Sequence, residues 1–233
     1  MTTTLVTGAN TGLGKETARQ LVAAGHIVYV GARDRERGQA AAEEIGARFV
    51  RLDVTDDASV HSALALIEAA GGLDVLVNNA GIAKRSPDGR GEALDGPSAL
   101  AVFDVNAVGV IRVTEAALPL LLRSANPVVV NVSSALGSFW ATHEPARPAA
   151  HYPAIVYGAS KAAVSMLTVQ YANAVPEVKF NAVEPGITAT NLGGGNHPGR
   201  PAEISARIVV RWATVGKDAP SGTFQEDDGE LGW

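Results

Sequence analysis

Short apolar runs alternate with longer amphipathic segments along most of the chain. Runs of about five residues rich in Val and Leu are typical of strands, and segments with apolar residues three and four apart are typical of helices. The pattern predicts strands at residues 3–7, 26–31, 48–52, 73–78, 127–132 and 178–183, and helices at residues 13–24, 35–45, 56–70, 98–123 and 156–174. The part of the chain after residue 183 is less regular.

The central strands carry apolar residues at successive positions, as in Val75-Leu76-Val77 and Val128-Val129-Val130. Such strands are buried on both faces, as in a parallel sheet with helices on either side. The sequence therefore predicts an α/β protein with a doubly wound parallel sheet (Rossmann-type), forming a single domain over residues 1–233. The substrate side of the crevice at the carboxyl ends of the strands is expected to be shaped by loops at residues 84–97, 135–153 and 191–201.

Composition and charge narrow the functional classes. The chain has 233 residues, of which 46% are hydrophobic and 25 are glycine, which indicates a globular core with glycine-dependent turns. A net charge of −5 with scattered basic residues argues against a nucleic acid or an anionic membrane as partner. The absence of cysteine excludes disulfides and thiolate nucleophiles, and the five histidines lack metal-ligand spacing, so no metal is expected. Without a signal-like start or a membrane-length apolar stretch, a cytoplasmic location is expected.

A glycine-rich turn separates the first predicted strand from the first predicted helix. Its glycines, Gly8, Gly12 and Gly14, have the spacing Gly-x3-Gly-x-Gly. A backbone without side chains at this point can approach a pyrophosphate at the helix N-terminus. The alternative is a tight strand-to-helix turn with no ligand.

This turn resembles that of the short-chain dehydrogenase/reductase family, and further motifs follow in the order that the family shows. They are Asp53 in Leu52-Asp53-Val54, Asn78-Asn79-Ala80-Gly81, Asn106, Ser133-Ser134, Tyr157-Gly158-Ala159-Ser160-Lys161 and Pro185-Gly186. The resemblance covers nearly the whole chain. It implies an oxidoreductase that uses a nicotinamide cofactor.

Tyr157 and Lys161 are spaced to lie on one face of a helix, so the ammonium group can sit near the phenol. A nearby positive charge is expected to lower the pKa of the phenol. The resemblance implies that Tyr157 is the general acid for carbonyl reduction and that Lys161 also binds the nicotinamide ribose. The alternative is an ordinary pair on a helix surface.

The resemblance also implies roles for Ser134 and Asn106. Ser134 would stabilise negative charge on the carbonyl oxygen, with Ser133 and Ser138 as competitors, because Tyr157 follows 23 positions after Ser134, a longer separation than the family usually has. The backbone of Asn106 would hold a water that links the lysine to solvent. A helix-interior asparagine without this role is the alternative.

The end of the second strand indicates the cofactor. Ala32 occupies the place of the carboxylate that binds the ribose of NAD, and Arg33 follows it, which favours NADP(H) over NAD(H). Alternatively, Arg33, Arg35 and Arg37 form a solvated charge cluster. By resemblance, the cofactor-binding residues are Gly8, Asn10, Thr11, Gly12, Leu13, Gly14, Arg33, Asp53, Val54, Asn79, Ala80, Gly81, Tyr157, Lys161, Pro185, Gly186, Ile187, Thr188 and Thr190.

These features predict an NADPH-dependent reductase, reversibly a dehydrogenase, that converts a ketone or aldehyde to an alcohol. An apolar substrate pocket or simple packing of an insertion would explain Phe139, Trp140, His143, His151 and Tyr152. A non-catalytic NADP(H)-binding sensor or interaction protein on the same fold is the alternative. A hydrolase is disfavoured because no Gly-x-Ser-x-Gly elbow exists, and a nucleotide-sugar epimerase is disfavoured by the glycine spacing. A homodimer, a homotetramer and a monomer all remain open.

Overall fold

A computed structural model describes residues 1–86, 88, 91–190, 192 and 199–233 of the chain. The strands are β1 (Thr3–Thr7), β2 (Ile27–Ala32), β3 (Arg48–Arg51), β4 (Val75–Asn78), β5 (Val128–Val132), β6 (Lys179–Val183), β7 (Thr223–Glu226) and β8 (Gly229–Glu230). The helices are α1 (Gly12–Ala23), α2 (Arg35–Ile45), α3 (Asp57–Ala69), α4 (Gly96–Phe103), α5 (Gly109–Leu121), α6 (Phe139–His143), α7 (Ile155–Ala174) and α8 (Ala202–Ala213).

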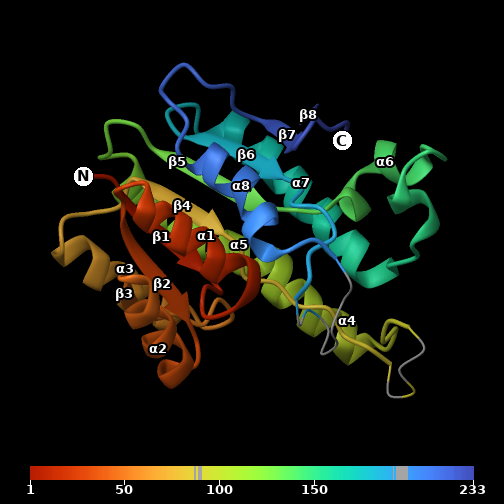
Figure 1. Ribbon diagram of the computed structural model, residues 1–233, viewed down its shortest axis with the longest axis horizontal. Coiled ribbons are helices and arrows are strands. Elements are labelled where there is room, and N and C mark those ends of the chain that lie inside the picture. Colours follow the sequence, from red (N-terminus) through yellow and green to blue (C-terminus); the bar gives the residue numbers. More distant parts are fainter. Residues whose placement is uncertain (87, 89–90, 191, 193–198) are drawn as a thin grey trace.

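The strands of the described residues form one sheet in the order β3-β2-β1-β4-β5-β6-β7-β8. Every pairing is parallel except that of β7 with β8. The order reverses between β1 and β4, and such a switch point is where an open α/β sheet binds its ligand. The predicted doubly wound α/β fold is confirmed (Figure 1).

Two apolar layers cover the sheet, one on each face. Helices α1, α2 and α8 pack on one face, and α3, α5 and α7 pack on the other. Along β4, Leu76 faces the second layer while Val75 and Val77 face the first, and all three are buried. Successive apolar residues of a strand therefore pack against the helices on opposite faces of the sheet.

Buried polar side chains fix α5 and α7 on the sheet. Asn78 donates hydrogen bonds to Thr114 of α5 at 3.1 Å and to Asn131 of β5 at 2.9 Å, and Asn131 donates to Thr168 of α7 at 2.9 Å. Each donor has an acceptor, so the amides need no water inside the core. This chain of bonds sets the position of the helix that carries Tyr157.

The structure differs from the predicted elements in three places. The helix predicted at residues 98–123 is α4, a π-helical turn (Asp104–Val108) and α5. The loop predicted at residues 135–153 contains α6 and two 3₁₀ turns, Ala135–Gly137 and Pro148–His151. The final part contains α8, β7 and β8, which the irregular pattern did not reveal. Most of the predicted loop 191–201 lies outside the described residues, as do residues 87 and 89–90 of the loop 84–97.

Candidate active site

The glycine-rich turn after β1 packs tightly against the segment that follows β4. Gly8 and Gly12 have φ angles of 64° and 54°, which favour glycine. A Cβ at Gly8 would lie 2.9 Å from the Cα of Ala80, and one at Gly14 would lie 2.3 Å from Nδ2 of Asn79. The turn therefore depends on glycine for both its conformation and its close contacts.

Asn79 and Thr7 hold this turn in place. The Asn79 amide donates to the carbonyl oxygen of Thr7 at 2.8 Å, and the Thr7 hydroxyl accepts from the backbone N–H groups of Asn79 and Ala80 at 3.0 Å each. Asn79 and Ala80, which are predicted to bind the cofactor, thus join the ends of β1 and β4. Their contact with a nucleotide remains a prediction.

The N-terminus of α1 differs from those of the next two helices. Asp34 and Asp56 accept backbone hydrogen bonds at the starts of α2 and α3, whereas Thr11, at the N-cap of α1, forms no side-chain cap bond within the described chain. The first turn of α1 also contains no acidic residue. Free N–H groups and the positive end of the helix dipole suit a phosphate, so this site fits the predicted dinucleotide.

The segment after β6 reaches back to the same turn. The Cγ2 atom of Thr190 lies 3.4 Å from the Cβ position of Gly12. The Thr188 hydroxyl donates to Ser205 at 2.7 Å, and Ile187 is exposed. Of these residues predicted to meet the cofactor, Thr190 is the one that contacts the glycine turn.

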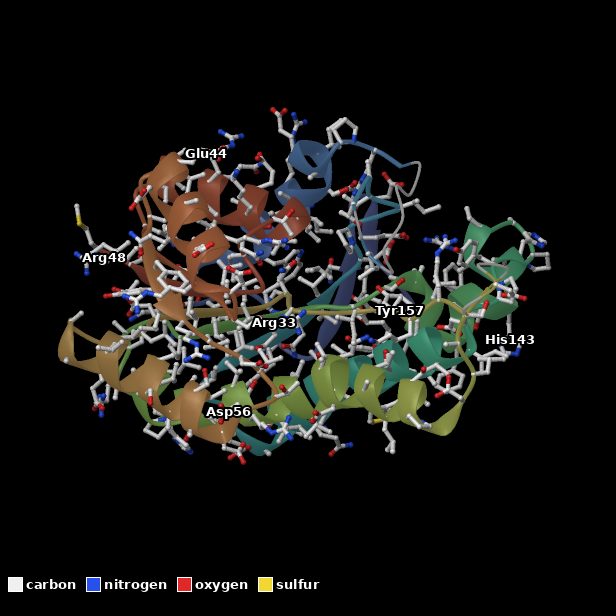
Figure 2. All side chains as sticks on the ribbon, turned by 90° about the horizontal axis from the view of Figure 1, so that it is seen from below. Arg33, Glu44, Arg48, Asp56, His143 and Tyr157 are labelled. Atoms are coloured by element: carbon white, nitrogen blue, oxygen red, sulfur yellow. The ribbon has the colours of Figure 1, made fainter. Side chains whose placement is uncertain are left out.

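Arg33 directly follows β2, is exposed, and forms no salt bridge with any residue that the structure describes. Figure 2 shows Arg33 at nearly the same height as Tyr157, with Glu44 above both.

The Asp53 carboxylate accepts from the N–H and the hydroxyl of Thr55 at 3.0 and 2.7 Å. Burial raises the pKa of Asp53, but the bonds from Thr55 and the charges of Arg33 and Arg51 outweigh burial and lower it. Asp53 therefore stabilises its own turn, and its contact with a nucleotide remains a prediction.

Tyr157 and Lys161 lie one turn apart on α7. The Lys161 Nζ atom is 5.7 Å from the centre of the Tyr157 ring and donates to the carbonyl oxygen of Val132 at 2.7 Å. Burial lowers the pKa of Lys161 to about 8, although the charge of Glu184 opposes this shift. Burial and the charge of Glu184 raise the pKa of the Tyr157 phenol. The phenol pKa is therefore above its ordinary value, whereas the sequence predicts a value below it.

The three serines predicted as candidates have different partners. Ser133 is buried and bonds to the Lys161 carbonyl oxygen and to Ser165, at 3.1 and 3.0 Å. Ser138 donates to the carbonyl oxygen of Gly232 at 2.6 Å. Ser134 accepts from the N–H of Leu136 at 3.2 Å, and no residue in the described part of the chain accepts its proton. Ser134 is thus the candidate with a free donor.

Two glycines bring the Ser134 turn against α7. A Cβ at Gly137 would lie 2.5 Å from the carbonyl carbon of Lys161, and one at Gly158 would lie 2.9 Å from the carbonyl oxygen of Leu136. The turn therefore packs on the stretch of α7 between Tyr157 and Lys161. The long separation between Ser134 and Tyr157 is accommodated because α6 and the second 3₁₀ turn occupy the intervening residues.

Asn106 lies in the π-helical turn and is buried. Its side chain donates to the carbonyl oxygen of Ile82 and to Ser160, both at 2.9 Å, and accepts from the N–H of Ile82 at 2.8 Å. The Cβ position of Gly81 is 3.5 Å from the Asn106 Oδ1 atom and 3.6 Å from the Lys161 Nζ atom. The fold therefore brings Gly81, Asn106 and Lys161 together from three distant segments.

Sequence reasoning missed two glutamates at this site. Glu92 accepts from the backbone N–H groups of Val156 and Tyr157 at 2.9 and 2.7 Å, and so caps α7, whose N-cap residue Ala154 has no polar side chain. Nothing in the sequence near Glu92 signals this long-range bond. Glu184 is a charged residue at the end of an apolar strand, and that position was a usable signal.

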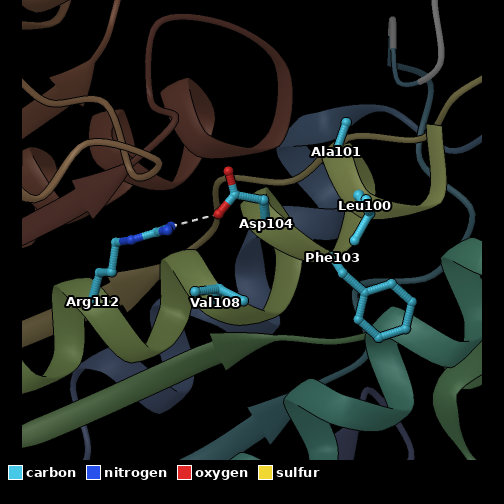
Figure 3. Close-up of a pocket in the computed structure, with 6 residues that line it drawn as sticks. All are labelled: Leu100, Ala101, Phe103, Asp104, Val108 and Arg112. Carbon is cyan, nitrogen blue, oxygen red and sulfur yellow. Dashed lines mark hydrogen bonds and ion pairs between the residues drawn. The ribbon is translucent and has the colours of Figure 1, made fainter. Parts of the chain in front are cut away.

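Two surface cavities border these elements. The larger, of 440 Å³, lies along α4, the π-helical turn and α5, where Arg112 pairs with Asp104 (Figure 3). The other, of 320 Å³, is lined by Leu136, Thr142, Ala149, Ala150, His151, Tyr152, Pro153, Ala154 and Ile155. Of the five residues considered for a substrate pocket, His151 and Tyr152 line the smaller cavity. Phe139, Trp140 and His143 are not among its lining residues, and Trp140 packs against Gly232.

The described residues contain no cluster of three His, Cys, Asp or Glu side chains that could hold a metal ion. Among the helices formed by those residues, none has the length and hydropathy that crossing a bilayer requires.

Comparison with known proteins agrees with this geometry. The family model described as short chain dehydrogenase matches residues 2–200. The short-chain dehydrogenase anuI of Penicillium roqueforti is 34% identical, with 98% of this chain and 96% of that protein covered. Salutaridine reductase of Papaver bracteatum is 32% identical, with 95% and 93% covered.

Two solved structures resemble the fold closely. Salutaridine reductase from Papaver somniferum superposes with a TM-score of 0.84 and 28% identity, covering 97% of this chain and 100% of that one. The NADPH-bound carbonyl reductase from chicken fatty liver gives a TM-score of 0.82 and 28% identity, covering 99% and 98%. This chain belongs to the short-chain dehydrogenase/reductase family of NAD(P)-dependent oxidoreductases, which act on small molecules.

Proposed function

We propose that this protein is an NADPH-dependent reductase that converts a ketone or aldehyde to an alcohol, and that the reaction is reversible. The observation that carries the proposal is the convergence of Lys161, Asn106 and Gly81 beside Tyr157 at the carboxyl ends of β4 and β5. This arrangement supports a role for Tyr157 as proton donor beside the glycine-rich segments that would hold a dinucleotide. Names of similar proteins, among them salutaridine reductase and carbonyl reductase, support a carbonyl substrate.

Three side chains, those of Tyr157, Ser134 and Lys161, would each have a role in reducing the substrate carbonyl. The bound nicotinamide would supply a hydride to the carbonyl carbon. Tyr157 would donate its phenolic proton to the carbonyl oxygen, and Ser134 would donate a hydrogen bond to that oxygen as negative charge develops. Lys161 carries its positive charge below pH 8, since its pKa is about 8, and would favour the phenolate that remains after proton transfer.

The cofactor preference rests on Arg33. A guanidinium group that is exposed and unpaired among the described residues can bind the 2′-phosphate of NADP(H), and the carboxylate that would bind the ribose of NAD is replaced by buried Ala32. The contact between Gly12 and Thr190 supports the proposal that the other cofactor residues taken from the motifs bind the same nucleotide. Loops 84–97 and 135–153 are proposed to shape the substrate side, because they supply Glu92 at the start of α7 and the cavity beside Tyr152.

Replacing the phenol tests the proposed reaction. Tyr157→Phe removes the proton donor, so turnover of ketones and aldehydes with NADPH should fall by at least about 100-fold. NADPH binding, followed by nicotinamide fluorescence, should change little. Tyr171→Phe is the matched control, because Tyr171 lies on the same helix and bonds to Glu115. Full turnover by Tyr157→Phe would mean that another group donates the proton, whereas NADPH binding without turnover of any carbonyl by the wild type would favour a non-catalytic NADP(H)-binding protein.

Replacing the arginine tests the cofactor. Arg33→Ala should weaken NADPH binding about 10- to 100-fold, the value of one charged hydrogen bond to phosphate, and should leave NADH binding nearly unchanged. Arg35→Ala removes a neighbouring charge on α2 and should have little effect on either nucleotide. Equal losses for the two variants would identify a general effect of positive charge, and the preference assigned to Arg33 would be withdrawn.

A further inference from the structure

Glu184 connects the two turns that border the proposed site. It directly follows β6, and its Oε2 atom accepts the backbone N–H of Ala135 at 2.6 Å, next to Ser134. Its Oε1 atom accepts the N–H of Gly186 at 2.9 Å. One carboxyl group thus joins the turn after β5 to the turn after β6.

The hydrogen bonds indicate that this carboxyl group is ionised. Both oxygens accept from N–H donors, an arrangement that a carboxylate satisfies fully and a protonated acid does not. Burial raises the pKa of Glu184, and the bonds from Ala135 and Gly186 oppose that rise. The negative charge of Glu184 is therefore bonded to an N–H group on each of the two turns.

Titratable or charged groups face Glu184 from three elements. Tyr157 and Lys161 face it from α7, Arg200 faces it from the segment before α8, and Glu226 faces it from β7. Two of these groups are paired elsewhere, because Arg200 forms a salt bridge with Asp227 and Glu226 forms one with Arg147. Arg200 also donates from Nε to the carbonyl oxygen of Pro185 at 3.0 Å. Lys161 forms no salt bridge with a described residue.

We infer that Glu184 is a positioning residue of the proposed reaction: its carboxylate holds the Ser134 turn against the Pro185–Gly186 turn, with its negative charge facing Lys161. This inference rests on the proposed function. Glu184 touches the two turns and acts on the substrate through Ser134 and Lys161.

Two substitutions separate the charge from the hydrogen bonds. Glu184→Gln removes the negative charge that raises the pKa of Lys161, so Lys161 should lose its proton at lower pH. The fall in kcat at high pH should then move to lower pH by roughly half a unit or more. At a fixed pH on this alkaline side of the profile, kcat should be about threefold lower than in the wild type. Glu184→Asp keeps the charge but shortens the side chain, so kcat should fall while the pH profile stays in place.

A measurement that does not depend on turnover makes the test independent of the proposed function. The ε-ammonium of Lys161 is titrated by NMR in the wild type and both variants, with Lys161→Arg to assign its signal. The midpoint should fall in Glu184→Gln and stay in place in Glu184→Asp. Glu115→Gln is the matched control, since Glu115 also bonds to α7 but through Tyr171, away from the site. That control should leave both the titration and the profile unchanged.

An unchanged Lys161 midpoint in folded Glu184→Gln would overturn the inference, as would equal shifts in the Gln and Asp variants. If Glu184→Gln fails to fold, Glu184→Asp still tests the inference. Full kcat in that variant would show that the bonds to Ala135 and Gly186 do not position the site. The proposed function fails separately, when wild-type protein turns over no carbonyl while the Lys161 midpoint still responds to Glu184→Gln.

Discussion

The turn after β1 and the turns after β5 and β6 all lie at the carboxyl ends of parallel strands, but different interactions hold them in place. The first is fixed by backbone approach, with Gly8 and Gly14 against Ala80 and Asn79. The carboxylate of Glu184 bonds the Ser134 turn to the turn after β6, and the carboxylate of Glu92 caps the start of α7. The nucleotide side therefore depends on close packing at glycines, whereas the substrate side adds carboxylate hydrogen bonds to the close packing of Gly137 and Gly158.

The first prediction adds a methyl group to the nucleotide side and has the largest expected effect. In Gly14→Ala the new Cβ would lie 2.3 Å from Nδ2 of Asn79 and 2.7 Å from the carbonyl oxygen of Gly8. Asn79 is itself bonded to Thr7 and cannot move freely. The free energy of unfolding should fall by about 1–3 kcal/mol. Urea unfolding measures this loss, and NADPH affinity should fall at least about tenfold.

A second glycine at the start of a helix provides the control for this variant. Gly96 lies in the first turn of α4, and a Cβ there would meet no atom of the described residues within 4 Å. Gly96→Ala should leave the stability equal to the wild type or raise it by up to about 1 kcal/mol. Equal losses in the two variants would show that the close packing at Gly14 is not the cause.

The second prediction removes a charge from the substrate side. Glu92→Ala leaves the first N–H groups of α7 without their acceptor, which should cost about 1–2 kcal/mol in unfolding free energy. Because one of those N–H groups belongs to Tyr157, kcat should also fall roughly tenfold. Asp56→Ala removes a comparable pair of bonds, to Ala58 and Ser59 at the start of α3.

The control should lose similar stability and keep its kcat, because α3 supplies no candidate catalytic residue. Parallel losses of kcat in the two variants would mean that destabilisation alone lowers activity. In that case Glu92 would be an ordinary helix cap rather than a group that positions Tyr157.

The same contrast explains which parts of the structure could be predicted. On the nucleotide side, signals are local: Gly25 with a φ of 87° follows the end of α1, and Asp34 caps α2 directly before it. Strand β1 and helix α2 were predicted with the bounds that the structure gives. The fold also brings the motif residues Gly81, Asn106 and Lys161 together.

On the substrate side, the decisive contacts join residues far apart in the chain. Glu92 bonds to Tyr157, Ser138 bonds to Gly232, and β7 lies beside β6 although α8 separates them in sequence. No short window contains both partners of such a contact, so periodicity cannot reveal it. The π-helical turn around Asn106 was also not predicted from the sequence, because it continues the amphipathic pattern of the helices on either side.

Titratable groups extend the contrast and give the smallest expected effect. At the amino ends of β1 and β2, the edge of the sheet opposite the glycine turn, His26 hydrogen-bonds to the hydroxyl of Thr4 at 2.8 Å, and burial lowers its pKa although Asp74 opposes the shift. As pH falls below about 6.5, the His26 ring binds a proton in the unfolded chain before it does so in the folded chain, so stability is lost on acidification.

Urea unfolding at pH 7.5 and 5.5 should show a smaller loss of unfolding free energy for His26→Asn than for the wild type, while exposed His61→Asn follows the wild type. Turnover of His26→Asn should keep the wild-type pH profile, and a changed profile would mean that this side of the sheet also tunes the reaction.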